Sequence, residues 1–222
     1  MSLSQALAGF AVLALMLTLV PGLDTAVVLR GALTRSRSYA FAVIVGIVTG
    51  LVLWGAAAGA GATAILAASR TAYRALSLAG AVYLAWMGLR MIVRSRRGED
   101  LSASTRSTRP VPALDDDSVP TGGLWHGWSI GLLTNLLNPK AGVFYLATIP
   151  QFMADGVPPL VMGILLSFIH AACTAVWLGA LALGAAWVGP RVAGARLTRW
   201  IDRVTGGLLI GFGVKLALDA RH

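Results

Sequence analysis

Long apolar runs are the feature that most constrains how this chain can fold. Six stretches are apolar enough to cross a bilayer as helices, which takes roughly 20 residues each. They are residues 3–22, 39–68, 75–93, 124–152, 158–188 and 201–220. Only 12% of the chain is charged, whereas water-soluble domains average about 25%. We therefore predict an all-α polytopic membrane protein surrounded by membrane lipid.

The basic residues predict how these spans are oriented. Thirteen of the 18 lysines and arginines lie on one side of the predicted membrane, four lie on the other, and Lys140 lies within a span. Positive charge gathers in cytoplasmic loops, so both termini should lie outside and the 94–123 loop inside, in a multi-pass protein of the cytoplasmic membrane. A pI near 11 is also typical of nucleic-acid-binding proteins. The arginines here sit in short clusters between apolar runs, so we expect no nucleic-acid partner.

Residues that build catalytic and metal centres are scarce. The chain has one cysteine and three histidines, which excludes an intrachain disulfide and a thiolate metal cluster. An enzyme needs a clustered acid and base, a nucleophile with its base, or a metal set. We therefore expect no metal, no cofactor and no catalytic residue. A metal-ion or other small-solute exporter and a membrane-embedded enzyme remain as alternatives.

The 94–123 loop divides the chain into two halves of similar pattern, residues 1–93 and 124–222. Its Ser, Thr, Pro and Asp content is typical of a disordered linker. Each half begins with a span interrupted by proline, at Pro21-Gly22 and at Asn138-Pro139. Each half has three spans, so duplicated halves must lie in opposite orientations. We predict two inverted three-helix repeats with broken helices at both prolines, a pattern typical of secondary transporters; chance similarity of apolar helices is the alternative.

The two predicted breaks carry charges inside the membrane, where a charge needs a partner or a purpose. Asn138 and Pro139 are typical of a helix start, as N-cap and first helical residue. Such a start attracts a carboxylate, and Lys140 adds a positive charge beside it. Asp24 follows the other break, where it either caps the next half-helix or meets a cation.

These residues predict a substrate cradle, in which Lys140 and helix-end N–H groups bind an α-carboxylate while Asp24 binds an α-ammonium group or a proton. The predicted substrate-binding residues are Pro21, Gly22, Asp24, Asn138, Pro139, Lys140 and Tyr145. The alternative is that Asp24 only caps a helix, that Lys140 extends toward the headgroups, and that Tyr145 only packs.

His170, in the fifth predicted span, is with Asp24 a candidate for proton coupling, because imidazole titrates near neutral pH. The alternative is a buried histidine bonded to a backbone carbonyl. Several glycines are spaced as Gly-x-x-x-Gly, which allows close helix approach. Spacings that lie within predicted spans begin at Gly46, Gly55, Gly127 and Gly207. We interpret them as packing positions that also permit a homodimer.

The motifs at the breaks also carry a family resemblance. Pro21-Gly22-x-Asp24 at the end of the first span, Asn138-Pro139-Lys140 in the fourth, six spans and a comparable length resemble the lysine exporter and threonine/homoserine exporter (LysE/RhtB) family. The resemblance runs from about Leu3 to Leu218, although the family's usual Pro-Gly-Pro is Pro21-Gly22-Leu23 here. It implies efflux of amino acids or close derivatives across the cytoplasmic membrane, driven by a proton or ion gradient.

Overall fold

A computed structural model describes residues 1–68, 70–97 and 123–184, with isolated residues between 200 and 214. Every regular element in these residues is helical, as predicted. The elements are α1 (Leu3–Leu19), α2 (Leu23–Thr34), α3 (Arg37–Ala68), α4 (Arg70–Arg97), α6 (Leu124–Leu136), α7 (Pro139–Thr148), the 3-10 helix η1 (Ile149–Phe152) and α8 (Pro159–Leu183). Residues 98–122 of the predicted linker and most of the predicted span 201–220 lie outside the described residues.

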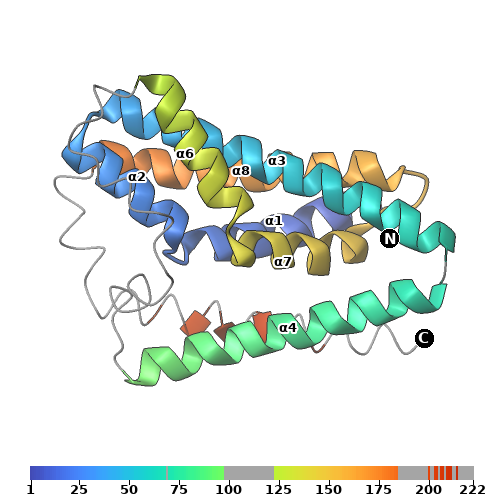
Figure 1. Ribbon diagram of the computed structural model, residues 1–222. Coiled ribbons are helices and arrows are strands. Elements are labelled where there is room, and N and C mark those ends of the chain that lie inside the picture. Colours follow the sequence, from blue (N-terminus) through green and yellow to red (C-terminus); the bar gives the residue numbers. More distant parts are fainter. Residues whose placement is uncertain are drawn as a thin grey trace.

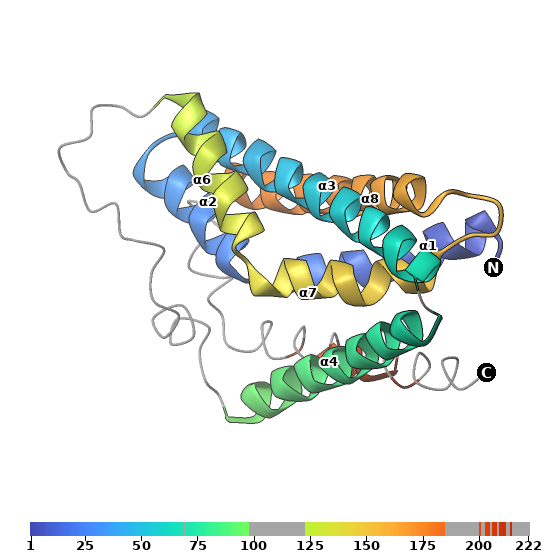
Figure 2. The same ribbon diagram turned by 45° about the vertical axis from the view of Figure 1, so that its right-hand side comes forward.

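Helix α3 is the centre of the bundle. It packs along both α6 and α8, and α2 packs against it near its start (Figure 1). Helices α1 and α7 lie on the other side of α8 and α3, with α4 beyond α7 (Figure 2). The chain therefore places the two interrupted helices, α1–α2 and α6–α7, in neighbouring positions around α3 and α8.

Glycines bring α3 into direct backbone contact with its two neighbours. A Cβ atom on Gly46 would collide with the carbonyl oxygen of Trp128 in α6, and one on Gly55 would collide with Ser167 of α8. Gly131 and Gly163 make the reciprocal contacts with α3 from the other side. The interpretation of Gly46, Gly55 and Gly127 as packing positions is confirmed within the chain. Nothing among the described residues lies within 4 Å of a Cβ on Gly207, and the homodimer stays a prediction.

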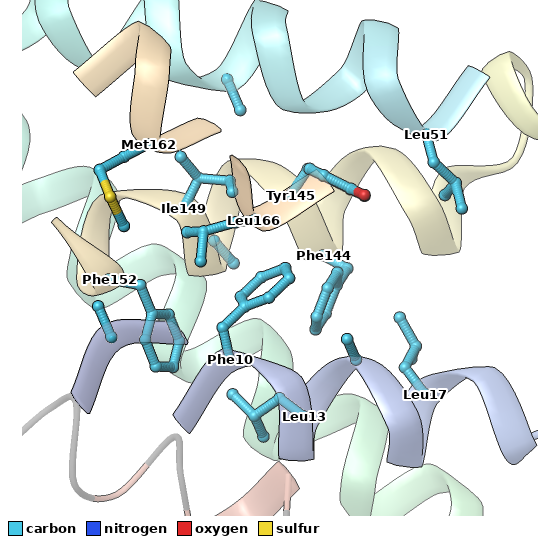
Figure 3. Close-up of a cluster of buried hydrophobic side chains, with 14 of the residues drawn as sticks. Phe10, Leu13, Leu17, Leu51, Phe144, Tyr145, Ile149, Phe152, Met162 and Leu166 are labelled. Carbon is cyan, nitrogen blue, oxygen red and sulfur yellow. The ribbon is translucent and has the colours of Figure 1, made fainter. Parts of the chain in front are cut away.

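Two apolar clusters fill the space between the helices. The larger joins α1, α7, η1 and α8, where the Phe10 ring meets Phe144 at a centroid distance of 5.8 Å and Phe152 at 5.5 Å (Figure 3). The smaller joins α2, α3 and α8 around Val28 and Leu178. Helix α8 contributes to both clusters, so it holds the two interrupted helices in one packed unit.

Both predicted helix breaks are confirmed. Helix α1 ends at Leu19 and α2 starts at Leu23, with a bend of 54° between them. Helix α6 ends at Leu136 and α7 starts at Pro139. Among the described residues, α3 and α8 are each long and apolar enough to cross a membrane, and the bent pair α1–α2 makes a third span if it crosses as one. The full set of six spans stays a prediction.

The close α3–α6 contact predicts opposite effects for two glycines of the same helix. Gly46→Ala must push α6 away, and such overpacking destabilises by about 1–3 kcal/mol. Nothing lies within 4 Å of a Cβ on Gly61 among the described residues, so Gly61→Ala should be neutral or stabilising by up to about 1 kcal/mol, because alanine favours helix. Thermal unfolding of the detergent-purified variants measures both. Equal melting temperatures would contradict the described contact.

Candidate functional site

The two helix breaks meet at a small pocket of about 50 Å³. Its lining residues are Leu17, Thr18, Val20, Gly22, Asp24, Thr25, Leu51, Asn138, Lys140, Ala141, His170, Thr174 and Leu178. A water molecule needs about 10–15 Å³ of such volume, so the cavity holds only a few waters. Small-molecule pockets usually measure about 300–1,000 Å³, so a substrate needs the helices to move.

Five of the predicted site residues line this cavity. They are Gly22, Asp24, Asn138, Lys140 and His170. Pro21 and Tyr145 are not among the lining residues, and the side chain of Pro139 lies outside the described parts. Apolar side chains also line the pocket, Leu17 and Leu51 from the larger cluster and Leu178 from the smaller. The polar groups therefore share a small space with apolar surface.

Lys140 joins the second break to the first. Its Nζ donates hydrogen bonds to the carbonyl oxygens of Leu17, at 3.1 Å, and Val20, at 3.2 Å. Carbonyls at a helix end have no partner within the helix, and they carry the negative end of the helix dipole. Lys140 neutralises this end of α1. The ammonium is thus held by protein carbonyls, and the alternative of a lysine extended toward headgroups is wrong.

Asn138 builds the start of α7 as predicted. Its side-chain Oδ1 accepts a hydrogen bond from the backbone N–H of Lys140 at 3.0 Å, and Pro139 is the first helical residue. The backbone oxygen of Asn138 accepts from the N–H groups of Ala141 and Gly142. The N–H groups at this helix start are therefore already bonded, which differs from the expectation that they would bind a carboxylate directly.

Asp24 lies in the first turn of α2 but does not cap it. Gly22 is the N-cap and makes no side-chain cap bond, so the capping alternative is wrong. Oδ2 of Asp24 accepts from Nδ2 of Asn135 at 3.2 Å, and the Lys140 charge attracts the same carboxylate. Oδ1 of Asp24 and Oδ1 of Asn135 are buried and have no hydrogen-bond partner among the described residues. A proton or a cation there would satisfy an acceptor.

His170 and Tyr145 form a buried pair. Nδ1 of His170 lies 3.2 Å from the Tyr145 hydroxyl, and the two rings stack with centroids 5.6 Å apart. The partner of His170 is therefore a side-chain hydroxyl rather than a backbone carbonyl. Tyr145 is fully buried and does not line the cavity, whereas its partner His170 does.

Three polar residues at the site were not predicted from the sequence: Thr18 and Thr174, which line the pocket, and Asn135, which bonds the lining residue Asp24. Asn135 is fully buried in α6, where it bonds Asp24 through its side chain and accepts from the Trp54 indole, at 3.4 Å, through its backbone oxygen. The hydroxyls of Thr18 and Thr174 lie 3.4 Å apart between α1 and α8. Asn135 could have been found from the sequence, because it is a polar residue one helical turn before Asn138. No sequence pattern distinguishes Thr18 and Thr174 from other threonines in the spans.

The described residues are helical wherever they form regular elements, and they gather a carboxylate and an ammonium group at two helix breaks around one pocket. This arrangement is typical of a membrane translocator. The sequence model of the LysE type translocator matches residues 15–220. The chain belongs to this family, and it is a transporter rather than an enzyme. Residues 127–131 match the Gly-x-Ser-x-Gly pattern of serine hydrolases. In those enzymes the serine lies on a strand-to-helix turn, whereas this serine lies inside α6, so the match does not indicate a nucleophile.

Curated relatives match nearly the whole chain. The threonine efflux protein of Escherichia coli (strain K12) is 30% identical over 90% of this chain and 91% of its own length. The homoserine/homoserine lactone efflux protein of Salmonella typhimurium is 26% identical over 93% of both chains. The membrane protein YrhP of Bacillus subtilis is 25% identical over 93% of this chain and 96% of its own. No solved structure matches significantly.

The Asp24–Asn135 bond predicts non-additive effects on stability. Asn135→Leu leaves a buried carboxylate without its amide donor, which we expect to lower the free energy of unfolding by about 1–3 kcal/mol. Asp24→Leu likewise leaves the amide unpaired. The double variant removes both polar groups, and its loss should be smaller than the sum of the single losses by about 0.5–3 kcal/mol. Thermal unfolding in detergent provides the comparison, and strictly additive losses would show that the two side chains do not interact.

Proposed function

We propose that this protein is a secondary active exporter of amino acids or close derivatives across the cytoplasmic membrane, and that it exchanges them for protons. Family membership and the names of the threonine and homoserine efflux relatives support this substrate class. The observation that carries the proposal is the placement of Asp24 and Lys140 on one small pocket, one after each helix break. A zwitterion presents the two complementary charges.

In the proposed binding mode, Lys140 binds the substrate carboxylate and Asp24 lies beside the ammonium group. The N–H groups at the start of α7 are bonded to Asn138, so the helix attracts the carboxylate through its dipole rather than through direct hydrogen bonds. Pro21, Gly22 and Pro139 shape the two breaks. Tyr145 acts indirectly by orienting His170.

Alternating access follows from the small volume of the cavity in this proposal. The site has to open to one side to admit a substrate and to the other to release it. Residues 1–93 and 124–222 are proposed as inverted three-helix halves that rock around the site, joined by a cytoplasmic linker at 94–123. The contact between Lys140 and the end of α1 supports this division, because it crosses from one half to the other.

Asp24 is the proposed proton carrier. Its Oδ1 is buried and lacks a partner among the described residues, so a proton taken from outside would neutralise a charge that is otherwise only partly compensated. His170 faces the same cavity and is the second candidate. Release of the substrate outside would be coupled to protonation, and return of the proton inside would reset the site.

Replacing Asp24 should uncouple transport from the pH gradient. Asp24→Asn keeps the size and a hydrogen-bonding group but cannot carry the proton, so inside-out vesicles should lose gradient-driven accumulation of labelled threonine or homoserine down to the level of vesicles without the protein. Asp155→Asn is the matched control, because Asp155 is 91% exposed at the surface, and it should accumulate substrate like wild type. Gradient-driven accumulation by Asp24→Asn at equal expression would refute the assignment.

The proposed orientation predicts which loops are reachable from outside. The Met1 amino group pairs with Asp155 at 2.9 Å, so the N-terminus and the loop before α8 lie at the same end, whereas the exposed Ser36 lies between α2 and α3. In a Cys173→Ser background, a cysteine at position 155 should react with an impermeant maleimide in intact cells. A cysteine at position 36 should react only after permeabilisation. The reverse pattern would invert the topology.

A further inference from the structure

The end of α1 has the chemistry of a site for a primary ammonium group. Two carbonyl oxygens, of Leu17 and Val20, converge on one nitrogen at 3.1 and 3.2 Å. That nitrogen belongs to a lysine, whose head group, –NH3⁺ on a tetrahedral carbon, is the group that an amino-acid substrate presents. We infer that the α1 carbonyls form the ammonium subsite of the transporter, that Lys140 occupies it in this structure, and that the substrate ammonium displaces Lys140 during transport.

The subsite exists because α1 ends inside the protein. The carbonyls of Leu17 and Val20 lie at or beyond the last turn of α1, and in a membrane they find no bulk water to bond. The negative end of the helix dipole adds to their attraction for a cation. A bound ammonium group therefore satisfies this helix end whether it comes from Lys140 or from a substrate.

Displacement of Lys140 keeps the charges balanced. The substrate ammonium takes over the two carbonyls, and the freed Lys140 ammonium pairs with the substrate carboxylate from the first turn of α7. Every charge in the site keeps a partner after the exchange. An amine without a carboxylate would expel Lys140 and leave it unpaired, and a carboxylate without an amine would leave the α1 carbonyls bare. The exchange therefore selects molecules that carry both groups.

The surroundings of the ammonium leave space for an incoming group. Gly22 borders it, and a Cβ on Gly22 would lie only 4.0 Å from Nζ of Lys140. Asp24 faces the same cavity, so a displacing ammonium group would also meet a carboxylate. Both features come from the first break, whereas Lys140 comes from the second, so the exchange links the two halves.

This inference rests on the proposed function, but it is tested by binding rather than by transport. Lys140→Ala removes the resident ammonium and frees the space of the Cγ, Cδ and Cε atoms that carry it, because alanine keeps the Cβ. Purified Lys140→Ala should therefore bind n-propylammonium, with a saturable rise in melting temperature. Half-saturation should fall at a concentration about tenfold or more below that for wild type, because hydrogen bonds to charged groups are worth roughly this factor or more.

Two controls define the specificity of this binding. Tetramethylammonium has the charge but no N–H donor, so it should not stabilise Lys140→Ala at the same ionic strength. Lys215→Ala removes the only other lysine of the chain, and it should respond to n-propylammonium as weakly as wild type does. Equal responses of wild type and Lys140→Ala, or equal stabilisation by tetramethylammonium, would overturn the inference.

A second variant covers the case in which Lys140→Ala does not fold. Lys140→Met fills the space of the side chain without its charge, so the subsite should then accept methylammonium rather than n-propylammonium. Failure to bind either ion would also overturn the inference. The transport assay separates the two proposals. A wild-type protein that exports amino acids while neither variant binds an alkylammonium ion keeps the proposed function and removes the displacement step.

Discussion

The structure of the site depends on how backbone groups at two interrupted helices find partners away from water. At the first break, the carbonyl oxygens at the end of α1 accept hydrogen bonds from Lys140. At the second, the Asn138 side chain caps α7 and the Trp54 indole bonds the carbonyl oxygen of Asn135. Lys140 thus completes α1 from the other half of the chain, and Trp54 of α3 completes α6. This mutual completion holds the breaks against each other and creates the cavity between them.

The frame around the cavity is of a different kind, because it consists of packed apolar surface. Helix α3 meets α6 and α8 through glycines that permit backbone contact, and α8 belongs to both apolar clusters. Such contacts leave little freedom to slide. The polar contacts at the breaks are individually weaker and depend on single side chains. Helix α3 belongs to residues 1–93, whereas α6 and α8 belong to residues 124–222, so the proposed rocking of the two halves has to change the packing of α3 against both helices.

Local signals account for what could be predicted from the sequence. Proline and an N-cap amide act within one helical turn, so both breaks and the roles of Asn138 and Pro139 were readable. Contacts between helices could not be predicted from local signals, because the angles at which helices cross decide which side chains meet. This second group includes the burial of Tyr145 beside His170, the bond from Asn135 to Asp24, and the absence of an Asp24 cap.

The occupied amides at the start of α7 have a consequence for selectivity. A helix start without an unbonded N–H group attracts negative charge through its dipole. It makes no directional hydrogen bonds that would distinguish one anionic group from another. Under the proposed function, discrimination among cargo molecules then falls to the other lining residues, which include the paired hydroxyls of Thr18 and Thr174 and the side chain of Leu178. These three side chains present hydroxyl and aliphatic surface and carry no charge of their own.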